Sequence, residues 1–148
     1  MSITTDITSA PIDVSTVIDS VADTRCGGIA TFIGTVRQEA SVGSRSEHDV
    51  TALDYDAHPT LAESRLAEIA EAAAVKWGLV HVAAVHRTGR CELGEPTVAI
   101  ACAAAHRAEA LDACRWLIDE LKATVPIWKR EIYADGTAWV EEPIQERE

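Results

Sequence analysis

The sequence predicts an α+β fold, in which helices, two of them long, pack against a mostly antiparallel or mixed β-sheet. Two observations favour this class. Segments with helical periodicity interrupt pairs of short β-branched segments, in the order α-β-β-α-β-β-α-β-β. The length of 148 residues suits one domain with a sizeable core. We expect that domain to cover residues 11–140, between flexible segments at residues 1–10 and 141–148.

The first elements follow from spacing and side-chain type. Residues 14–22 place valine and isoleucine at helical spacing, with Ser15 as the candidate N-cap. A Cys-Gly-Gly sequence ends this pattern, and the β-branched residues 28–37 predict a strand. A polar, serine-rich loop over residues 38–49 follows, and the alternating residues 50–57 predict the next strand.

The middle of the chain predicts a long helix followed by strands. Pro59 opens the helix over residues 60–77, whose apolar side chains share one face, and Gly78 ends it. Residues 79–85 predict a strand, after which a loop is expected. Residues 97–105 are nearly all apolar and predict a strand buried on both faces.

The last third predicts a second long helix and a hairpin. Residues 107–122 carry their large apolar side chains on one helical face, and Pro126 prevents the helix from continuing. Residues 127–133 and 137–140 flank an Asp-Gly turn, which predicts two antiparallel strands.

Composition excludes some classes of function. Acidic residues outnumber lysine plus arginine by 24 to 13, a net charge of -11, which argues against a general binder of nucleic acid or membrane surfaces. A local basic cluster could still hold a small anion. The four cysteines show no C-x-x-C spacing, so we expect neither metal nor cofactor. The absence of a secretory signal or an apolar run of about 18 residues favours a reduced, cytoplasmic protein.

Two bases stand where the second long helix begins. His106 and Arg107 follow an apolar strand, and the free backbone N–H groups and macrodipole of a helix start favour an anion. An anion bound between both bases would satisfy all of these groups. The alternative is that His106 only caps the helix, while Arg107 lies in solvent or pairs with Glu109.

A second cluster surrounds Pro126. Residues 121–130 contain Lys122, Lys129 and Arg130 and no acid. Because the proline redirects the chain from helix to strand, the two lysines could approach one another, and clustered, partly buried lysines have lowered pKa values. Such a lysine can act as a nucleophile or proton-transfer group. The alternative is a solvated basic edge with Trp128 in the core.

Two weaker signals lie on strands. Arg37 follows Thr35 and Val36 at a strand end beside a polar loop, where it could clamp a phosphate, although most such arginines are surface charges. His86 stands on an otherwise apolar strand, and a histidine there is more often a hydrogen-bonded structural residue than a ligand.

Taken together, these segments resemble the catalytic (large) subunit of molybdopterin synthase. The most specific one is the Lys-x-x-Val-Pro-Ile-Trp-Lys string, and the resemblance covers about residues 25–140 in order and spacing. The matching motifs are Gly28-Ile-Ala-Thr-Phe-Ile-Gly-Thr-Val-Arg37, His86-Arg87-Thr-Gly89, Ala105-His106-Arg107, Leu121-Lys122-x-x-Val125-Pro-Ile-Trp-Lys129, Asp135-Gly136 and Trp139-Val140.

The resemblance implies a fold, a reaction and partners. The fold would be an α/β hammerhead. The activity would be a sulfurtransferase of molybdenum cofactor biosynthesis, which puts two sulfurs into cyclic pyranopterin monophosphate. The sulfur would arrive as a thiocarboxylate on the C-terminal Gly-Gly of a small ubiquitin-like carrier, whose tail threads into a pocket. The chain would form a homodimer within a heterotetramer, with one carrier at each end.

The resemblance also implies roles for residues. Lys122 would be the catalytic lysine, with Lys129 second, and fixed cations would stabilise the negative charge that develops in the reaction. The remaining substrate-pocket positions would be Arg37, His106, Arg107 and Arg130, with Thr35, Val36 and Glu131 beside them. The loop over residues 38–49 is longer than the family pattern and lacks its asparagine, so its contacts, like those of the C-terminal tail, do not carry over.

Two other classes of function remain open from sequence. One is a non-catalytic module that binds an anionic ligand or a ubiquitin-like C-terminal tail. The other is a purely structural α+β domain, which predicts that the cations scatter over separate surfaces. Both lysines lying in one pocket with His106 and Arg107 would favour the enzyme.

Overall fold

The computed structural model describes residues 1–38 and 49–141 of the chain. Over this range the helices are α1 (Val14–Asp19), α2 (Leu61–Trp77) and α3 (Arg107–Thr124). The strands are β1 (Ser2–Thr8), β2 (Gly28–Thr35), β3 (Val50–Ala57), β4 (His81–Arg87), β5 (Gly89–Glu92), β6 (Pro96–Ala104), β7 (Ile127–Tyr133) and β8 (Ala138–Glu141). No described helix is long and apolar enough to cross a membrane.

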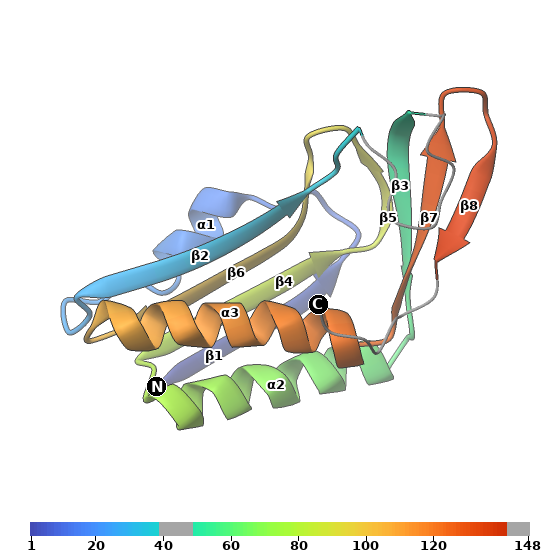
Figure 1. The fold of residues 1–148 in the computed structure, drawn as a ribbon. Helices are drawn as coiled ribbons and strands as arrows, with labels where there is room; N and C mark the ends of the chain where they lie inside the picture. The colour runs from blue at the N-terminus through green and yellow to red at the C-terminus, as the bar shows by residue number, and fades with distance from the viewer. Residues whose placement is uncertain (39–48, 142–148) are drawn as a thin grey trace.

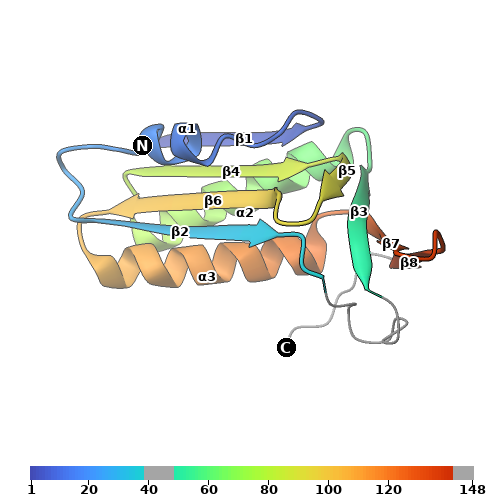
Figure 2. The same ribbon diagram turned by 90° about the horizontal axis from the view of Figure 1, so that it is seen from above.

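The described strands form two sheets, which we call sheet A and sheet B. Sheet A has the order β1-β4-β6-β2, and sheet B has the order β5-β3-β7-β8. All pairs are antiparallel except β1 with β4. Helices α2 and α3 cover one face of sheet A and α1 lies on the other, while sheet B stands at one end of sheet A (Figures 1 and 2). The predicted α+β fold, with a mixed sheet and two long helices, is confirmed.

The main core lies between sheet A and the two long helices. Leu66 and Leu117 of these helices and Ile100 of β6 are completely shielded from solvent. Burying a side chain of this size stabilises the fold by about 1.5–3 kcal/mol. On the other face, Val17 and Val21 pack against a row of alanines, whose small side chains let the short helix approach the sheet closely.

The expectation of a flexible segment at residues 1–10 is wrong. Ser2–Thr8 forms β1, which pairs in parallel with β4, with Ser2 opposite His81 and Thr8 opposite Arg87. Threonine has a high strand propensity, and Ile3 and Ile7 pack against the main core. The polar composition of this segment concealed an edge strand with one apolar face. Of the expected flexible tail at residues 141–148, all but Glu141 lie outside the described residues.

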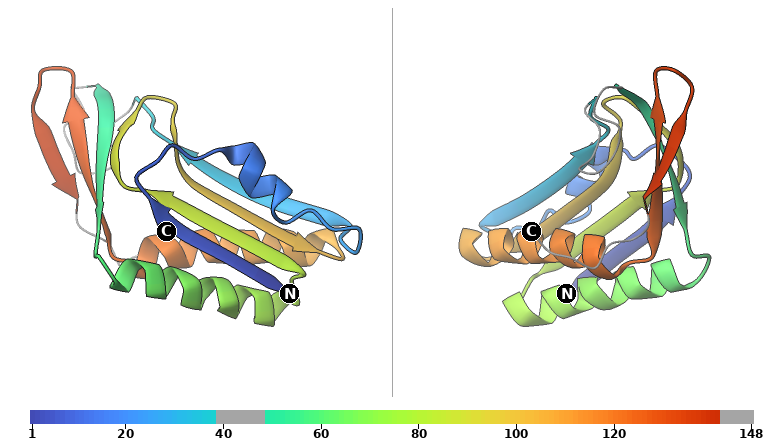
Figure 3. Two further views of the ribbon diagram at one scale, coloured as in Figure 1. Left: turned by 180° about the vertical axis from the view of Figure 1, so that it is seen from behind. Right: turned by 45° about the vertical axis from the view of Figure 1, so that its right-hand side comes forward.

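Other element boundaries also differ from expectation. The N-cap of α1 is Asp13, whose Oδ1 accepts from the Thr16 backbone N–H at 3.3 Å, and Ser15 donates its hydroxyl to the same carboxylate. The loop expected after residue 85 contains the end of β4 and the short strand β5. That strand pairs with β3 and so begins sheet B directly where sheet A ends (Figure 3).

Candidate active site

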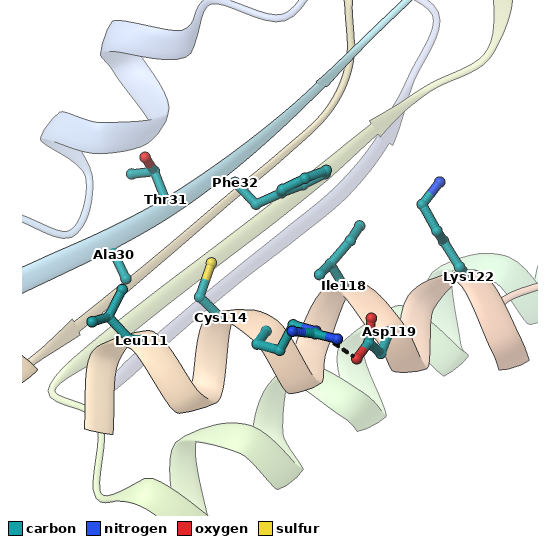
Figure 4. A pocket seen from close by; sticks show the side chains of 9 residues that line it. Ala30, Thr31, Phe32, Leu111, Cys114, Ile118, Asp119 and Lys122 are labelled. Carbon is teal, nitrogen blue, oxygen red and sulfur yellow. Dashed lines mark hydrogen bonds and ion pairs between the residues drawn. The ribbon is translucent and has the colours of Figure 1, made fainter. Parts of the chain in front are cut away.

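An apolar groove of about 400 Å³ runs between β2 and α3. Its walls include Ala30 and Phe32 of the strand, and Cys114, Ile118 and Lys122 of the helix (Figure 4). The three helical residues are spaced by four, so they share one face of α3. Lys122 lies in the last turn of the helix, where its positive charge is favourable toward the helix dipole. The groove is therefore mostly apolar, with an Arg115–Asp119 ion pair on its rim and the Lys122 cation at one end.

The inner face of sheet B carries the second lysine. Alternation along β7 puts Lys129, Glu131 and Tyr133 on one face. Glu131 is 1% exposed, accepts from the Tyr133 hydroxyl at 3.0 Å, and lies 4.0 Å from the Lys129 Nζ. Across the sheet, Tyr55 of β3 stands opposite Lys129. The buried Glu131 carboxylate therefore holds the Lys129 and Tyr133 side chains at fixed places.

His86, near the end of β4, is a buried histidine beside sheet B. It is 5% exposed, its Nδ1–H donates to the Arg87 carbonyl oxygen at 2.7 Å, and its ring meets Tyr55 edge-on with centroids 4.9 Å apart. Burial, with a smaller contribution from the Lys122 charge, lowers the pKa of His86 to about 4. The imidazole is therefore neutral at pH 7. On its other side, Tyr55 separates His86 from the strand that carries Lys129.

The end of β2 lies at the same end of the molecule as sheet B (Figures 1 and 2). Val36 is buried, and its backbone is held by hydrogen bonds with Glu95 and Gly94 at 3.2 and 2.9 Å. Thr35 and Arg37 are exposed on either side of it. The anchored backbone thus presents the Arg37 side chain to solvent at the end of the strand.

His106 and Arg107 lie at the opposite end of α3 from Lys122. Both are exposed, and the His106 side chain makes no capping hydrogen bond. With a rise of 1.5 Å per residue, Arg107 and Lys122 are about 22 Å apart along the helix. Gly28, at the start of β2, lies directly against this junction, where an added Cβ would be 3.3 Å from the Arg107 Cα. A single chain therefore does not bring these two bases to the lysines.

Arg130 faces away from the lysines. It follows Lys129 on β7, so its side chain projects from the outer face of sheet B. There its Nη2 donates to the Asp54 carboxylate at 2.9 Å. The strand alternation was already visible in the sequence and could have separated Arg130 from Lys129 and Glu131. Among residues 1–38 and 49–141, no group of three or more His, Cys, Asp and Glu side chains is arranged to hold a metal ion.

Together, these features define an α+β protein of hammerhead architecture, in which one lysine from a helix and one from sheet B lie near the junction of the two sheets. The family model for the MoaE protein matches residues 7–124, and the chain therefore belongs to this family, as the sequence motifs indicated.

Similar sequences from other organisms agree. The chain is 44% identical over 133 residues to the molybdopterin synthase catalytic subunit of Oryza sativa subsp. indica, covering 90% of this chain and 66% of the rice protein. It is 40% identical over 139 residues to that of Halalkalibacterium halodurans, covering 94% of this chain and 86% of the relative.

Solved structures share the fold. Molybdopterin synthase from Staphylococcus aureus superposes with a TM-score of 0.82 at 30% identity, covering 91% of this chain and 94% of that one. A complex of subunits 1 and 2 of the molybdopterin-converting factor from Helicobacter pylori shares the fold with a TM-score of 0.71 at 19% identity, covering 88% and 86%.

Proposed function

We propose that this chain is the catalytic subunit of a molybdopterin synthase, a sulfurtransferase of molybdenum cofactor biosynthesis. It would convert cyclic pyranopterin monophosphate to molybdopterin with sulfur from a carrier thiocarboxylate. Family membership supports this assignment. The observation that carries it is the environment of the buried His86: burial and, to a smaller extent, the Lys122 charge lower its pKa, and its ring packs against Tyr55, which stands opposite Lys129 in the β3–β7 pairing.

We assign the central role to Lys122. Its stem lies on the wall of the groove and its charge stands at the groove's end. The reaction displaces oxygen and develops negative charge, which a fixed cation stabilises. Lys129, held near Glu131, is the second cation, and Arg37 supplies a third at the end of β2.

We propose that a second copy supplies His106 and Arg107. Strand β2 is the last strand of sheet A, and exposed apolar side chains flank it, with Ile29 41% and Leu111 59% exposed. Antiparallel pairing of two β2 edges about a two-fold axis would put the start of one strand beside the end of the other. The bases at the start of α3 would then lie beside the partner's lysines, which joins two half-sites that one chain leaves about 22 Å apart.

The sulfur carrier would dock at the outer end of each half of this homodimer, giving a heterotetramer. An apolar groove that ends at cations suits an extended C-terminal tail that carries a terminal thiocarboxylate. The two-subunit complex from Helicobacter pylori supports such an assembly. We further infer a cytoplasmic location, which the four free cysteines support.

The separation of His106 and Arg107 from the lysines within one chain is the observation that favours the alternative, a non-catalytic module for an anion or a ubiquitin-like tail. One assay separates the two functions. The protein is mixed with thiocarboxylated carrier and cyclic pyranopterin monophosphate, and molybdopterin is measured. Product formation is expected, and its absence with competent partners would overturn the proposal.

Complementation tests the shared site. Lys122→Ala and Arg107→Ala are each expected to be nearly inactive alone. In a mixed dimer, one of the two sites would contain both native residues, so the equilibrated mixture should recover roughly one quarter of the wild-type rate. Lys76→Ala, a lysine in the last turn of α2, is the matched charge control and should remain fully active. Unrestored activity after exchange of subunits would show that the two half-sites are not shared.

A further inference from the structure

His86 belongs to one of the motifs that resemble the family, but it is not among the expected substrate-pocket residues. It is the last residue of β4 on the face covered by the long helices. The same strand face carries Val82 and Ala84, both fully buried in the main core. In the sheet A register, His86 stands between Ile7 of β1 and Val98 of β6. Its backbone is therefore paired on both sides within sheet A.

The side chain of His86 is held on two sides. The Arg87 carbonyl oxygen can only accept, so Nδ1 carries the proton and the ring tautomer and orientation are fixed. The ring plane lies at 76° to that of Tyr55, the edge-on geometry that aromatic pairs favour. This contact joins sheet A to sheet B at the buried junction between them.

Tyr55, the contact of His86 on sheet B, is a neighbour of Lys129. Tyr55 stands opposite Lys129 in the β3–β7 pairing, and Lys129 lies 4.0 Å from the buried Glu131. The Lys122 charge, in the last turn of α3, is near enough to add to the effect of burial in lowering the pKa of the same histidine. Ala57 and Ile127 of sheet B also pack against the main core, and the His86–Tyr55 contact adds a fixed point directly beside the strand position of Lys129.

We propose that His86 is a positioning residue for sulfur transfer: its ring, fixed on the rigid core and packed edge-on against Tyr55, holds Lys129 of sheet B at a constant place relative to Lys122 of α3. This inference rests on the proposed function. The neutral state of the His86 ring fits this role. Because burial keeps its pKa at about 4, the ring adds no positive charge near Lys122 at pH 7. A misplacement of about 1 Å in such a site can lower a rate by about 100-fold.

The kinetic test compares a variant that keeps an aromatic ring at position 86 with a variant that lacks one. His86→Leu is expected to lower kcat by about 10- to 100-fold, with KM and carrier affinity little changed. His86→Phe retains a ring edge for Tyr55 and should stay within about threefold of wild type. His81→Ala, at the other end of the same strand, removes a histidine with two hydrogen bonds and is the matched control, with loss of stability but not of kcat. Equal losses in the Leu and Phe variants would overturn the proposal.

A double-mutant cycle tests the contact from its other side. Tyr55→Leu should reduce kcat about as much as His86→Leu, and the double variant should be no slower than either, because both break one contact. If the fold-losses in kcat of the two single variants multiplied in the double variant, the proposal would be overturned. Tyr55→Leu also keeps the test valid if His86→Leu fails to fold.

A third readout does not need the enzyme to be active. The chain has only three lysines, so ¹³C-dimethylation of lysine amines gives few NMR signals, with Lys76 as an internal reference. His86→Leu should shift the Lys129 signal and leave Lys76 unchanged. In a Tyr55→Leu background, the same substitution should leave Lys129 where it is. An inactive wild type would overturn the proposed function alone, whereas an unmoved Lys129 signal would overturn the role of His86.

Discussion

Sheet A and sheet B are built on different principles. Sheet A is sealed by α2 and α3, and its inner positions are filled by alanine, valine, isoleucine and cysteine with almost no exposure. Within the described residues, no helix covers the inner face of sheet B, and its smaller apolar cluster, which includes Leu53 and Cys91, lies beside a buried carboxylate, Glu131, with Tyr133 and Lys129 around it. The first sheet is stabilised by apolar burial, whereas the second combines apolar burial with fixed polar groups that cost some stability. The proposed site lies where the two sheets meet.

The largest expected effect on stability comes from a core residue of α3 that does not line the groove. Leu117 is completely buried, and Leu117→Ala should lower the free energy of unfolding by about 2–5 kcal/mol, because it leaves a cavity in the main core. Sulfur transfer per folded molecule should change little, since the side chain does not line the groove. Denaturant unfolding and an assay at low temperature measure the two quantities. A rate loss as large as that of Lys122→Ala would mean that the core and the site are not separate.

A second substitution on the same helix should affect activity and leave stability almost unchanged. Lys122→Ala should reduce molybdopterin formation by about 100-fold or more, because it removes the cation at the end of the groove. The free energy of unfolding should change by less than about 0.5 kcal/mol, as for other exposed positions. Carrier binding, measured by titration, should persist. Near-normal product formation would remove Lys122 from the mechanism.

This contrast also explains what the sequence could predict. Long periodic segments such as α2 and α3, and the apolar strand β6, were predictable because each buries a regular apolar face. The turn at Pro126 predicts that Lys122 and Lys129 approach one another, and this stays a prediction. The strand β1 was not, because its two isoleucines alternate with threonine and aspartate in a segment that resembles a polar tail.

The pairing of His86 with Tyr55 could not be predicted from sequence either. The two residues belong to different sheets, and their contact depends on how sheet B is set against sheet A, which no local pattern encodes. A signal did exist for His86 alone. It continues the buried face of β4 after Val82 and Ala84, and a histidine on such a face needs a fixed hydrogen bond, which the Arg87 carbonyl oxygen provides.

The next expected effect is a pH dependence at the junction. Because the pKa of His86 is lowered to about 4, the unfolded chain takes up this proton before the folded chain does. Stability should therefore fall as the pH drops from about 6.5 toward 4, by a contribution on the order of 3 kcal/mol at pH 4. His86→Phe should lack this contribution. Unfolding of both proteins at several pH values measures the difference, and parallel curves would place the ring in contact with water rather than in the core.

The smallest expected effect concerns the polar core of sheet B. Glu131→Gln keeps the shape of the side chain and an acceptor for the Tyr133 hydroxyl, but it removes the charge near Lys129. We expect a loss of about 1 kcal/mol in the free energy of unfolding. The Lys129 side chain is 25% exposed, so water screens part of the attraction and the loss should stay this small.

The double variant of Lys129 and Glu131 shows whether Lys129 or Tyr133 holds the buried Glu131 carboxylate. Lys129→Met alone removes a partner from a buried carboxylate, so it should destabilise the protein more than Glu131→Gln does. If the carboxylate is held mainly by that lysine, adding Glu131→Gln to Lys129→Met should restore stability rather than lower it further. Simple addition of the two losses would instead mean that the Tyr133 hydroxyl holds Glu131 in place. Sheet B would then orient its carboxylate without Lys129, leaving the lysine available to the substrate.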